Sequence, residues 1–385
     1  MSNWRYVKIG DVCTVERGGS PRPIDKFITV DPNGINWIKI GDTNSSMYIT
    51  QTAQKIIPEG MKKSRYVQPG DFLLSNSMSF GRPYILKIDG CIHDGWLLLR
   101  DNDGIFDKRF LYYYLSSPST YQKFKNMAVG GVVNNLNSEM VRGVTVPVPP
   151  MDEQIDIVTT LDKVTELIAL RKEQLGKLDQ LVKSRFIELF GDPVYNNNGL
   201  PTKKLCELGS LDRGRSQHRP RNDPKLLNGP YPLIQTGEVA SAGLYITEYK
   251  NTYSELGLQQ SKMWKAGTLC ITIAANIAQT AILTFDACFP DSVVGFVPND
   301  AVSAIYMHYW FGFFQKILEE QAPQVAQKNI NLKILSDLDV MVPTKEQQEQ
   351  FAAFVEQTDK SKLAIQKSLD KLELLKKSLM QQYFG

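Results

Sequence analysis

Basic and hydrogen-bonding side chains crowd into two short segments of the sequence. Residues 213–225 read RGRSQHRPRNDPK and carry five Lys or Arg side chains against one acid, while residues 17–26 read RGGSPRPIDK and carry three against one. Arg, Gln, Asn and Ser are side chains that contact phosphates and base edges in nucleic acids, and Gly and Pro fix turns. A solvated charged loop is the alternative for either segment alone. Their equivalent positions in an internal repeat favour nucleic-acid recognition.

Polar residues also follow apolar runs at two further places in each half of the chain. The turn SNSMSFGRP at 75–83 corresponds to the stretch 273–279, and residues 130–135 correspond to 324–329. These segments are either loops that insert into a groove of DNA or ordinary turns. The full set of candidate DNA contacts is Arg17, Ser20, Arg22, Lys26, Asn76, Ser77, Arg82, Asn134, Asn135, Arg213, Arg215, Gln217, His218, Arg219, Arg221, Asn276, Gln279, Lys328 and Asn329.

Residue patterns typical of catalysis or metal binding are sparse. The sequence has no GxxxxGK[ST] phosphate loop, and its only Pro-Pro pair, Pro149-Pro150, follows a valine and so does not form the amino-methyltransferase pattern. The three histidines, His93, His218 and His308, lie far apart, and the second half has a proline at the position of His93. The five cysteines form no CxxC pair. We therefore expect no catalytic residue and no metal site, and interpret His93 as structural.

Length and composition limit the class of protein. The chain has 385 residues, 42% of them hydrophobic, and a net charge of +3 from 44 Lys and Arg against 41 Asp and Glu. A chain of this length predicts two or three domains, and near-neutral charge restricts nucleic-acid binding to local clusters. The most apolar stretch, 269–285, contains Asn276 and Gln279 and predicts two buried strands joined by a turn rather than a membrane span. With no apparent signal peptide, a cytoplasmic location is expected.

The two halves of the chain repeat each other. LVKSRFIELFG at 181–191 aligns with LKKSLMQQYFG at 375–385, an offset of 194 residues, and upstream the offset slips to 196 and 197, as between Asp94 and Asp291. The chain is therefore interpreted as a tandem duplication. The middle of each copy is the most diverged. Such divergence favours two related modules that recognise different things, although simple drift would leave a similar pattern.

Each copy changes character once along its length. Residues 1–147 show short apolar runs separated by Gly, Pro, Asn and Asp, which predict strands and turns, followed by a helical stretch at 106–124. The three tyrosines 112–114 on that stretch are interpreted as packing residues. From Met151 to Phe190 the pattern is continuously helical and lacks proline. The second copy repeats this order, so a module followed by a long helix is predicted twice.

Both long helices carry an apolar stripe with alternating spacings of three and four residues. Such a stripe is typical of a coiled coil, although two amphipathic helices on separate domains would also bury one. The duplication favours the pair, because a fused dimer with two-fold symmetry makes its helices antiparallel. At 1.5 Å per residue, about 40 residues form a rigid spacer about 60 Å long. The predicted seam is Leu161, Val164, Ile168, Leu175, Leu178, Val182, Leu189, Val355, Ile365, Leu369, Leu372 and Leu379.

With these features, the chain resembles the specificity subunits of type I restriction-modification systems over nearly its whole length. The start of the first long helix, VPPMDEQ at 148–154, is the most specific piece, and the second copy, VPTKEQQ at 342–348, departs from it at Thr344 and Gln347. The other segments that carry the likeness are WRYVKIGDV, WIKIGD, QPGDFLLS, NNLN and FIELFGDP in the first copy, and KKLCELG, LIQTGE, KAGTLCIT, KNIN and QQYFG in the second.

The resemblance implies an α+β fold with a pseudo-two-fold duplication, in which two mixed α/β target-recognition domains are separated by an antiparallel coiled-coil-like pair of long helices. The implied boundaries are 1–150, 151–192, 199–342 and 343–385 for domain, helix, domain and helix. It also implies a non-catalytic DNA-reading subunit in which each domain binds one half of a bipartite double-stranded DNA target. The helices would set the spacer and dock two methylation subunits, and through them the restriction subunits. No cofactor is expected in this chain, since S-adenosylmethionine, ATP and Mg²⁺ would belong to the partners.

Two other classes of function compete with this interpretation. One is a stand-alone DNA-binding protein or nuclease with its own cutting site. The other is a duplicated scaffold with no nucleic-acid role. Cleavage of DNA by the isolated chain would support the first, and binding without dependence on salt would support the second, because phosphate contacts make affinity fall steeply with salt.

Overall fold

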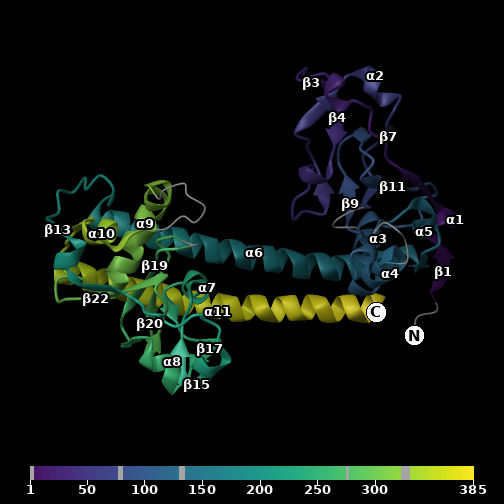
Figure 1. The fold of residues 1–385 in the computed structure, drawn as a ribbon. Coiled ribbons are helices and arrows are strands. Elements are labelled where there is room, and N and C mark those ends of the chain that lie inside the picture. The colour runs from purple at the N-terminus through teal and green to yellow at the C-terminus, as the bar shows by residue number, and fades with distance from the viewer. Residues whose placement is uncertain (1–3, 77–80, 130–134, 275–276, 322–329) are drawn as a thin grey trace. The chain divides into compact units, whose positions relative to one another are not determined.

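The computed structural model describes residues 4–76, 81–129, 135–274, 277–321 and 330–385. The chain forms two compact units, one made of residues 1–172 with 367–385 and the other of residues 173–366 (Figure 1). Two long helices, α6 (Met151–Phe190) and α11 (Lys345–Phe384), each contribute one part to either unit. Each unit therefore holds one β-rich module and a segment of both helices.

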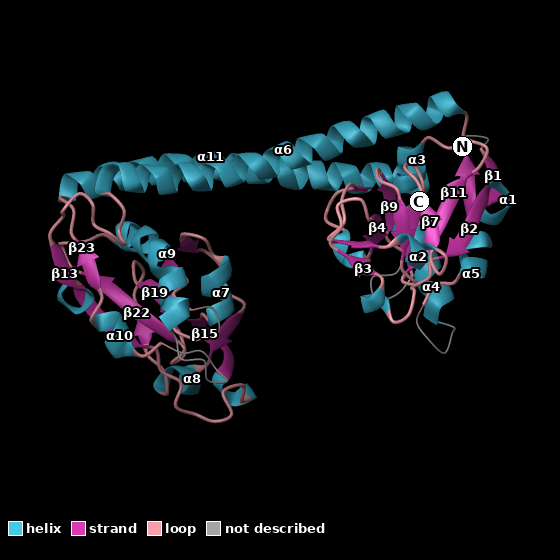
Figure 2. Ribbon diagram, turned by 90° about the horizontal axis from the view of Figure 1, so that it is seen from above, coloured by secondary structure: helices cyan, strands magenta, loops and turns pink. Residues whose placement is uncertain are grey.

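The first unit is built on an inner and an outer sheet. The inner sheet has the strand order β2-β11-β8-β9-β5, antiparallel except where β5 joins β9 in parallel, and the outer sheet has the order β3-β6-β4-β10-β7. A short antiparallel ribbon pairs β1 with β12. Figure 2 shows β1 beside α1. The strands are β1 (Arg5–Lys8), β2 (Cys13–Arg17), β3 (Ile28–Thr29), β4 (Ile35–Ile38), β5 (Tyr48–Ile49), β6 (Gln54–Ile56), β7 (Arg65–Val67), β8 (Phe72–Ser75), β9 (Pro83–Leu86), β10 (Gly90–Ile92), β11 (Trp96–Asp101) and β12 (Thr145–Val148).

Helices cover one side of the inner sheet in the first unit. They are α1 (Ile9–Val12), α3 (Lys108–Leu115), α4 (Pro118–Val129) and α5 (Ser138–Arg142), while α2 (Pro58–Met61) and the 3-10 turns η1 (Ile24–Lys26) and η2 (Ile40–Asp42) belong to the outer part. The helical stretch predicted at 106–124 is confirmed by α3 and α4. The buried side chains of Tyr113 and Tyr114 confirm that the tyrosine triplet packs.

The second unit repeats this topology with one strand fewer in its outer sheet. Its inner sheet is β14-β22-β19-β20-β16, its ribbon is β13-β23, and its outer sheet is β17-β15-β21-β18, in which β3 has no counterpart among the described residues. The prediction of a tandem duplication is thus confirmed as a repeated fold. The elements are β13 (Thr202–Lys204), η3 (Leu205–Glu207), β14 (Gly209–Arg213), η4 (Pro224–Leu226), β15 (Leu227–Leu233), α7 (Thr236–Ser241), β16 (Tyr245–Ile246), β17 (Asn251–Tyr253), α8 (Glu255–Gln259), β18 (Met263–Trp264), β19 (Leu269–Thr272), β20 (Thr280–Leu283), β21 (Ala287–Cys288), β22 (Val293–Pro298), α9 (Ala304–Gln321), α10 (Leu332–Ser336) and β23 (Asp339–Met341).

The inner sheet is buried on both faces because its central strands are apolar throughout. Successive side chains of a strand point to opposite faces. Accordingly Phe72 and Leu74 of β8 pack into the core beneath the helices, whereas Leu73 between them packs with the outer sheet. The stretch 269–285 behaves in the same way, since it forms the buried antiparallel strands β19 and β20, as predicted. No helix in the described part of the chain is long and apolar enough to span a membrane.

The two long helices run antiparallel in each unit. In the first unit Lys172 of α6 pairs with Glu373 of α11 at 2.8 Å, and Leu161 shares a core with Met380. In the second unit the Nζ of Lys362 lies 2.6 Å from a carboxylate oxygen of Asp179. The residue numbers therefore fall along one helix as they rise along the other, as the duplication predicted. Every predicted seam residue is buried or half-buried.

A buried glutamine ties the start of each long helix to its module. Gln154 is 1% exposed, its Oε1 accepts from the Asp107 amide at 2.8 Å, and its Nε2 donates to the carbonyls of Ile105 and Pro149. Gln348, at the offset of 194, makes the same three bonds to Ser303, Ala301 and Pro343. The final glutamine of each helix-start segment thus has one structural role in both units.

The departures in the second helix-start segment form a cap. The Thr344 amide donates to Gln347 Oε1 at 3.1 Å, and the Gln347 amide donates to Thr344 Oγ1 at 3.3 Å. This reciprocal pair is a capping box, which satisfies amides that a helix N-terminus otherwise leaves without partners. α11 consequently begins at Lys345, the counterpart of Met151 in α6. In the second copy, a capping box of Thr344 and Gln347 thus starts the helix at the position where the first copy has Pro150.

Candidate nucleic-acid interface

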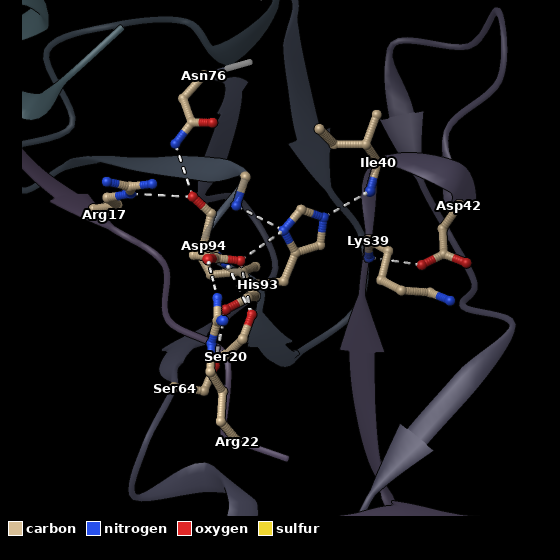
Figure 3. Close-up of polar contacts among 12 residues, drawn as sticks. Arg17, Ser20, Arg22, Lys39, Ile40, Asp42, Ser64, Asn76, His93 and Asp94 are labelled. Carbon is tan, nitrogen blue, oxygen red and sulfur yellow. Dashed lines mark hydrogen bonds and ion pairs between the residues drawn. The ribbon is translucent and has the colours of Figure 1, made fainter. Parts of the chain in front are cut away.

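Asp94 forms hydrogen bonds with four of the candidate residues of the first unit (Figure 3). Its carboxylate accepts from Ser20 Oγ at 2.8 Å and from Arg22 Nη2 at 3.2 Å. Its main-chain oxygen accepts from Arg17 Nε at 3.1 Å and from Asn76 Nδ2 at 2.8 Å. Loops that are separated by up to 77 residues in sequence therefore converge on the turn between β10 and β11. Asp94 was not among the predicted contacts.

Asp291 occupies the equivalent position in the second unit. Arg221 Nη2 donates to its two carboxylate oxygens at 2.7 and 2.9 Å, and Arg219 Nη2 lies 3.9 Å from Oδ2. Arg219 corresponds to Arg22, because each precedes a proline through a cis peptide bond in the same loop. Both basic segments are thus organised by an aspartate at one conserved place in the repeat. The alignment of Asp94 with Asp291 was the sequence signal for it.

The main chains of the two basic loops are fixed by the same hydrogen bonds. Gly18 donates to the Trp96 carbonyl at 2.9 Å, and its counterpart Gly214 donates to the Val293 carbonyl at 2.9 Å. Both glycines lie where another backbone approaches closely, since a Cβ on Gly18 would stand 2.1 Å from the His93 carbonyl oxygen. The main chain of each loop is therefore held at this glycine by the neighbouring backbone.

Replacing Gly18 by alanine should displace the first basic loop. The added Cβ meets main-chain atoms that cannot rotate away, and overpacking of this kind costs about 1–3 kcal/mol. Amide exchange at residue 18 should accelerate about tenfold or more, because its bond to Trp96 is weakened. Gly41→Ala is the matched control, since no described heavy atom lies within 4 Å of its built Cβ. Unchanged exchange at residue 18 would contradict the close-approach argument.

The charges around Asp94 favour an ionised carboxylate. Partial burial raises the pKa of Asp94, but the hydrogen bonds from Ser20 and from its own main-chain amide, with the nearby His93 and Arg22, outweigh burial and leave that pKa below its ordinary value. Burial lowers the pKa of the neighbouring His93, against the opposing charge of Asp94. His93 Nδ1 accepts from the Gly95 amide at 2.6 Å, and its ring lies 6.4 Å from that of Trp37. Its role in the described structure is packing, in line with the interpretation from sequence.

Exposure separates residues that can touch a ligand from those that position others. Arg22 is 80% exposed at its side chain and Lys26 is exposed at the end of η1. Asn76 is only 2% exposed, and its carbonyl accepts from the Leu136 amide at 3.0 Å. Asn76, a predicted DNA contact, is thus buried in the described structure, where its side chain bonds the Asp94 carbonyl and its main chain bonds the segment after half-buried Asn135.

Exposure is also high in the basic loop of the second unit. Arg215, Gln217, Arg219 and Arg221 are exposed, while Arg213 is half-buried. His218 Nε2 lies 3.1 Å from a carboxylate oxygen of Asp223, within the same loop. The second loop thus presents more cationic side chains than the first, as its sequence indicates.

Arg82 and Gln279 lie at a second pair of equivalent places. Both close the turn between two inner strands, where the Arg82 amide donates to Ser75 Oγ and the Gln279 amide donates to Thr272 Oγ1, each at 3.1 Å. Arg82 lines a cavity of about 330 Å³ with Tyr112, and Gln279 lines one of about 660 Å³. Neither cavity includes the basic loops. Arg82 therefore bonds Ser75, the neighbour of Asn76, and lines a cavity that does not include the basic loop.

Five of the predicted contacts, Ser77, Asn134, Asn276, Lys328 and Asn329, lie outside the described residues.

Comparison with known protein families agrees with the repeated architecture. The family model described as "Type I restriction modification DNA specificity domain" matches residues 1–180 and again 198–376. The chain belongs to this family. The two matched specificity domains follow the internal repeat, and each includes part of a long helix. The family resemblance inferred from the helix-start segments is confirmed.

Specificity subunits of type I restriction enzymes align with this chain at low identity over most of their own length. The type I restriction enzyme MjaVIII specificity subunit of Methanocaldococcus jannaschii is 20% identical over 407 residues, which span 98% of this chain and 91% of that protein. The type I restriction enzyme EcoBI specificity subunit of Escherichia coli is 22% identical over 392 residues, 92% of this chain and 79% of that protein. Both alignments span more than nine tenths of this chain.

Solved structures share the fold of the specificity domains. The type I restriction-modification system S subunit from M. genitalium has a TM-score of 0.59 at 14% identity, and the match covers 100% of this chain and 96% of that chain. A chain from a type I R-M system studied for its complex assembly has a TM-score of 0.63 at 19% identity, with coverage of 99% and 97%. The predicted α+β architecture with paired helices is confirmed.

Proposed function

We propose that this chain reads a bipartite double-stranded DNA target, each unit binding one half through its basic loop. The observation that carries the proposal is the shared frame around Asp94 and Asp291. Both units hold exposed arginines on a loop of the same construction, while the side chains around it differ. Phosphate contacts position a protein on DNA, and side chains that reach base edges specify sequence. A shared loop construction with different side chains in the two units therefore suits two different half-sites.

The long helices are proposed to set the unread spacer and to dock two methylation subunits, through which the restriction subunits join. Support comes from large apolar side chains that remain exposed on both helices. Leu181 on α6 and its counterpart Leu375 on α11 are 49% and 45% exposed. Each helix carries further exposed leucines, Leu167 and Leu170 on α6 and Leu363 and Leu374 on α11. Groups of exposed apolar side chains mark protein contact surfaces. Equivalent positions on both helices suit two copies of one partner.

Cofactors are proposed to lie in the partners. S-adenosylmethionine would be bound by the methylation subunits, and ATP and Mg²⁺ by the restriction subunits. This agrees with a sequence that has no phosphate loop.

The test is to express the chain with its methylation subunits and to map the methylated DNA positions in the host. A motif of two short sequences separated by an unread spacer of fixed length is expected. The affinity of the complex should fall steeply with salt, because Lys and Arg contacts to phosphate release counterions. Cleavage of DNA by the isolated chain with Mg²⁺, or a single continuous motif, would contradict the proposal.

Duplicating the second module should make the target symmetric. Residues 1–147 would be replaced by a second copy of residues 199–341, which keeps both long helices intact. Because the units repeat one fold with antiparallel helices, the methylated motif should contain the second half-site twice in inverted orientation, with the spacer unchanged. The parent chain is the control. A motif that keeps the original first half-site would show that the modules do not read independently.

A further inference from the structure

Each outer sheet holds a cavity beside its basic loop. The cavity of the first unit measures about 840 Å³ and that of the second about 460 Å³. Each is bounded by the basic loop on one side and by the ends of two antiparallel strands on another. Polar residues line both cavities: Ser20, Arg22, Lys39 and Gln54 in the first unit, and Ser216, Arg221, Gln235 and Asn251 in the second.

Strand register makes two polar positions equivalent in the two cavities. Trp37 of β4 stands opposite Gln54 of β6, and Leu233 of β15 stands opposite Asn251 of β17. On its other side, β4 pairs in parallel with β10, where Cys91 stands opposite Trp37. In the same way β15 pairs with β21, where Cys288 stands opposite Leu233. Just past the ends of β4 and β15, two residues after Trp37 and after Leu233, stand Lys39 and Gln235. The pair Lys39 and Gln54 therefore corresponds to Gln235 and Asn251.

The pair in the first unit offers hydrogen-bond donors. Lys39 Nζ donates to Gln54 Oε1 at 2.8 Å. A lysine ammonium can only donate, so this contact assigns the oxygen of the Gln54 amide to Lys39 and leaves the NH₂ group directed away from it. Both side chains are half-buried, which limits competition from water. The ammonium and the amide NH₂ together form an edge of donors.

The pair in the second unit has a different character. Gln235 and Asn251 are exposed, and each terminal amide contains both an acceptor oxygen and a donor NH₂ group. The position that is an ammonium in the first unit is thus a neutral amide in the second. The two cavities differ in hydrogen-bonding pattern as well as in volume.

Base edges discriminate between these patterns. In the major groove guanine presents two acceptors, N7 and O6, whereas adenine presents the acceptor N7 and the donor N6. A pair of donors matches guanine, and an amide that both accepts and donates matches adenine. We propose that Lys39 with Gln54 reads a guanine in the first half-site and that Gln235 with Asn251 reads an adenine at the equivalent position of the second. This inference rests on the proposed function and names the bases that it recognises.

The test converts the first pair into the second. The full chain carrying Lys39→Gln and Gln54→Asn is expressed with its methylation subunits, and the methylated motif is mapped as for the parent chain. One guanine of the first half-site should become adenine, while the second half-site and the spacer stay unchanged. Lys39→Gln alone should reduce the preference for that guanine about 10- to 100-fold, the range expected for one paired base contact.

Lys55→Gln is the matched control for the loss of a lysine. Lys55 follows Gln54 on the same strand, but its Nζ bonds the Pro32 carbonyl, away from the cavity lining. This variant should keep the parent motif. The reciprocal change, Gln235→Lys with Asn251→Gln, should turn an adenine of the second half-site into guanine, and it keeps the test open if the first variant fails to fold.

The possible outcomes separate the two proposals. A first half-site that is unchanged in the folded double variant, or a change that falls in the half-site of the unaltered unit, would overturn the assignment of bases. A parent complex with no bipartite motif would overturn the proposed function itself. A change of one base in the half-site of the altered unit supports both.

Discussion

Replacing Asp94 by alanine should reduce discrimination of the first half-site about 10- to 100-fold. The carboxylate holds Ser20 and Arg22 in one orientation, and without it the basic loop loses the two side-chain bonds that fix its position above β10 and β11. Misplaced contacts at one or two base pairs cost about 1–3 kcal/mol each. The measurement is competition between the cognate DNA and DNA scrambled in the first half-site, with the chain in its methylation complex.

Asp94→Ala should have the opposite effect on the affinity for non-specific DNA. Removing a negative charge beside Arg22 raises attraction to phosphate, so non-specific affinity should rise slightly while specificity falls. Asp94→Asn keeps a side chain that can accept from Ser20 and should fall between the parent and Asp94→Ala. Asp291→Ala is the matched variant for the second half-site. Equal losses at both half-sites from Asp94→Ala would contradict a local role.

Replacing Gln154 by alanine should destabilise the first unit by about 2–4 kcal/mol. The change removes three buried hydrogen bonds and leaves the Asp107 amide and the Ile105 and Pro149 carbonyls to find other partners. Each buried group left unsatisfied costs about 1–3 kcal/mol, and partial access of water lowers the sum. The start of α6 should loosen from the module, which hydrogen exchange at residues 107–115 would detect.

The repeat supplies the comparison for Gln154. Gln348→Ala removes the same set of bonds in the second unit and should destabilise that unit by a similar amount, without a change of exchange in the first. Gln180→Ala, on an exposed part of α6, should alter the free energy of unfolding of neither unit by more than about 0.5 kcal/mol. If Gln154→Ala matched Gln180→Ala, the buried glutamine would not be a structural tie.

Periodic features were predictable from sequence because they depend on spacing along one segment. The helix from Met151 to Phe190, the seam along it, and the paired strands within 269–285 follow from local patterns of apolar residues. The duplication added the antiparallel helix pair, since a repeated module and helix have few symmetric arrangements. The described structure and the family match confirm the helix, the strands and the antiparallel pair, and the predicted seam residues are buried or half-buried.

The candidate site was only partly predictable. The basic loops could be located from sequence, because composition is a local property. Asn76 and Arg82 were grouped together, but the structure buries Asn76 against the Asp94 carbonyl and places Arg82 at a cavity that Asn76 does not line. It passed over Asp94, whose partners Ser20 and Arg22 lie 74 and 72 residues away. A single aspartate carries no pattern of its own, and its role exists only where separate loops meet.

The sequence by itself determined that one unit of module and helix is used twice, because apolar periodicity and repetition are properties of the linear chain. Only the tertiary structure decided which side chains share a surface. Strand register brings Lys39 to Gln54, and loop closure brings Asn76 to Asp94. Neither contact is encoded by spacing along one segment. Only the folded units show which pair of side chains presents hydrogen-bond donors alone and which presents both donors and acceptors.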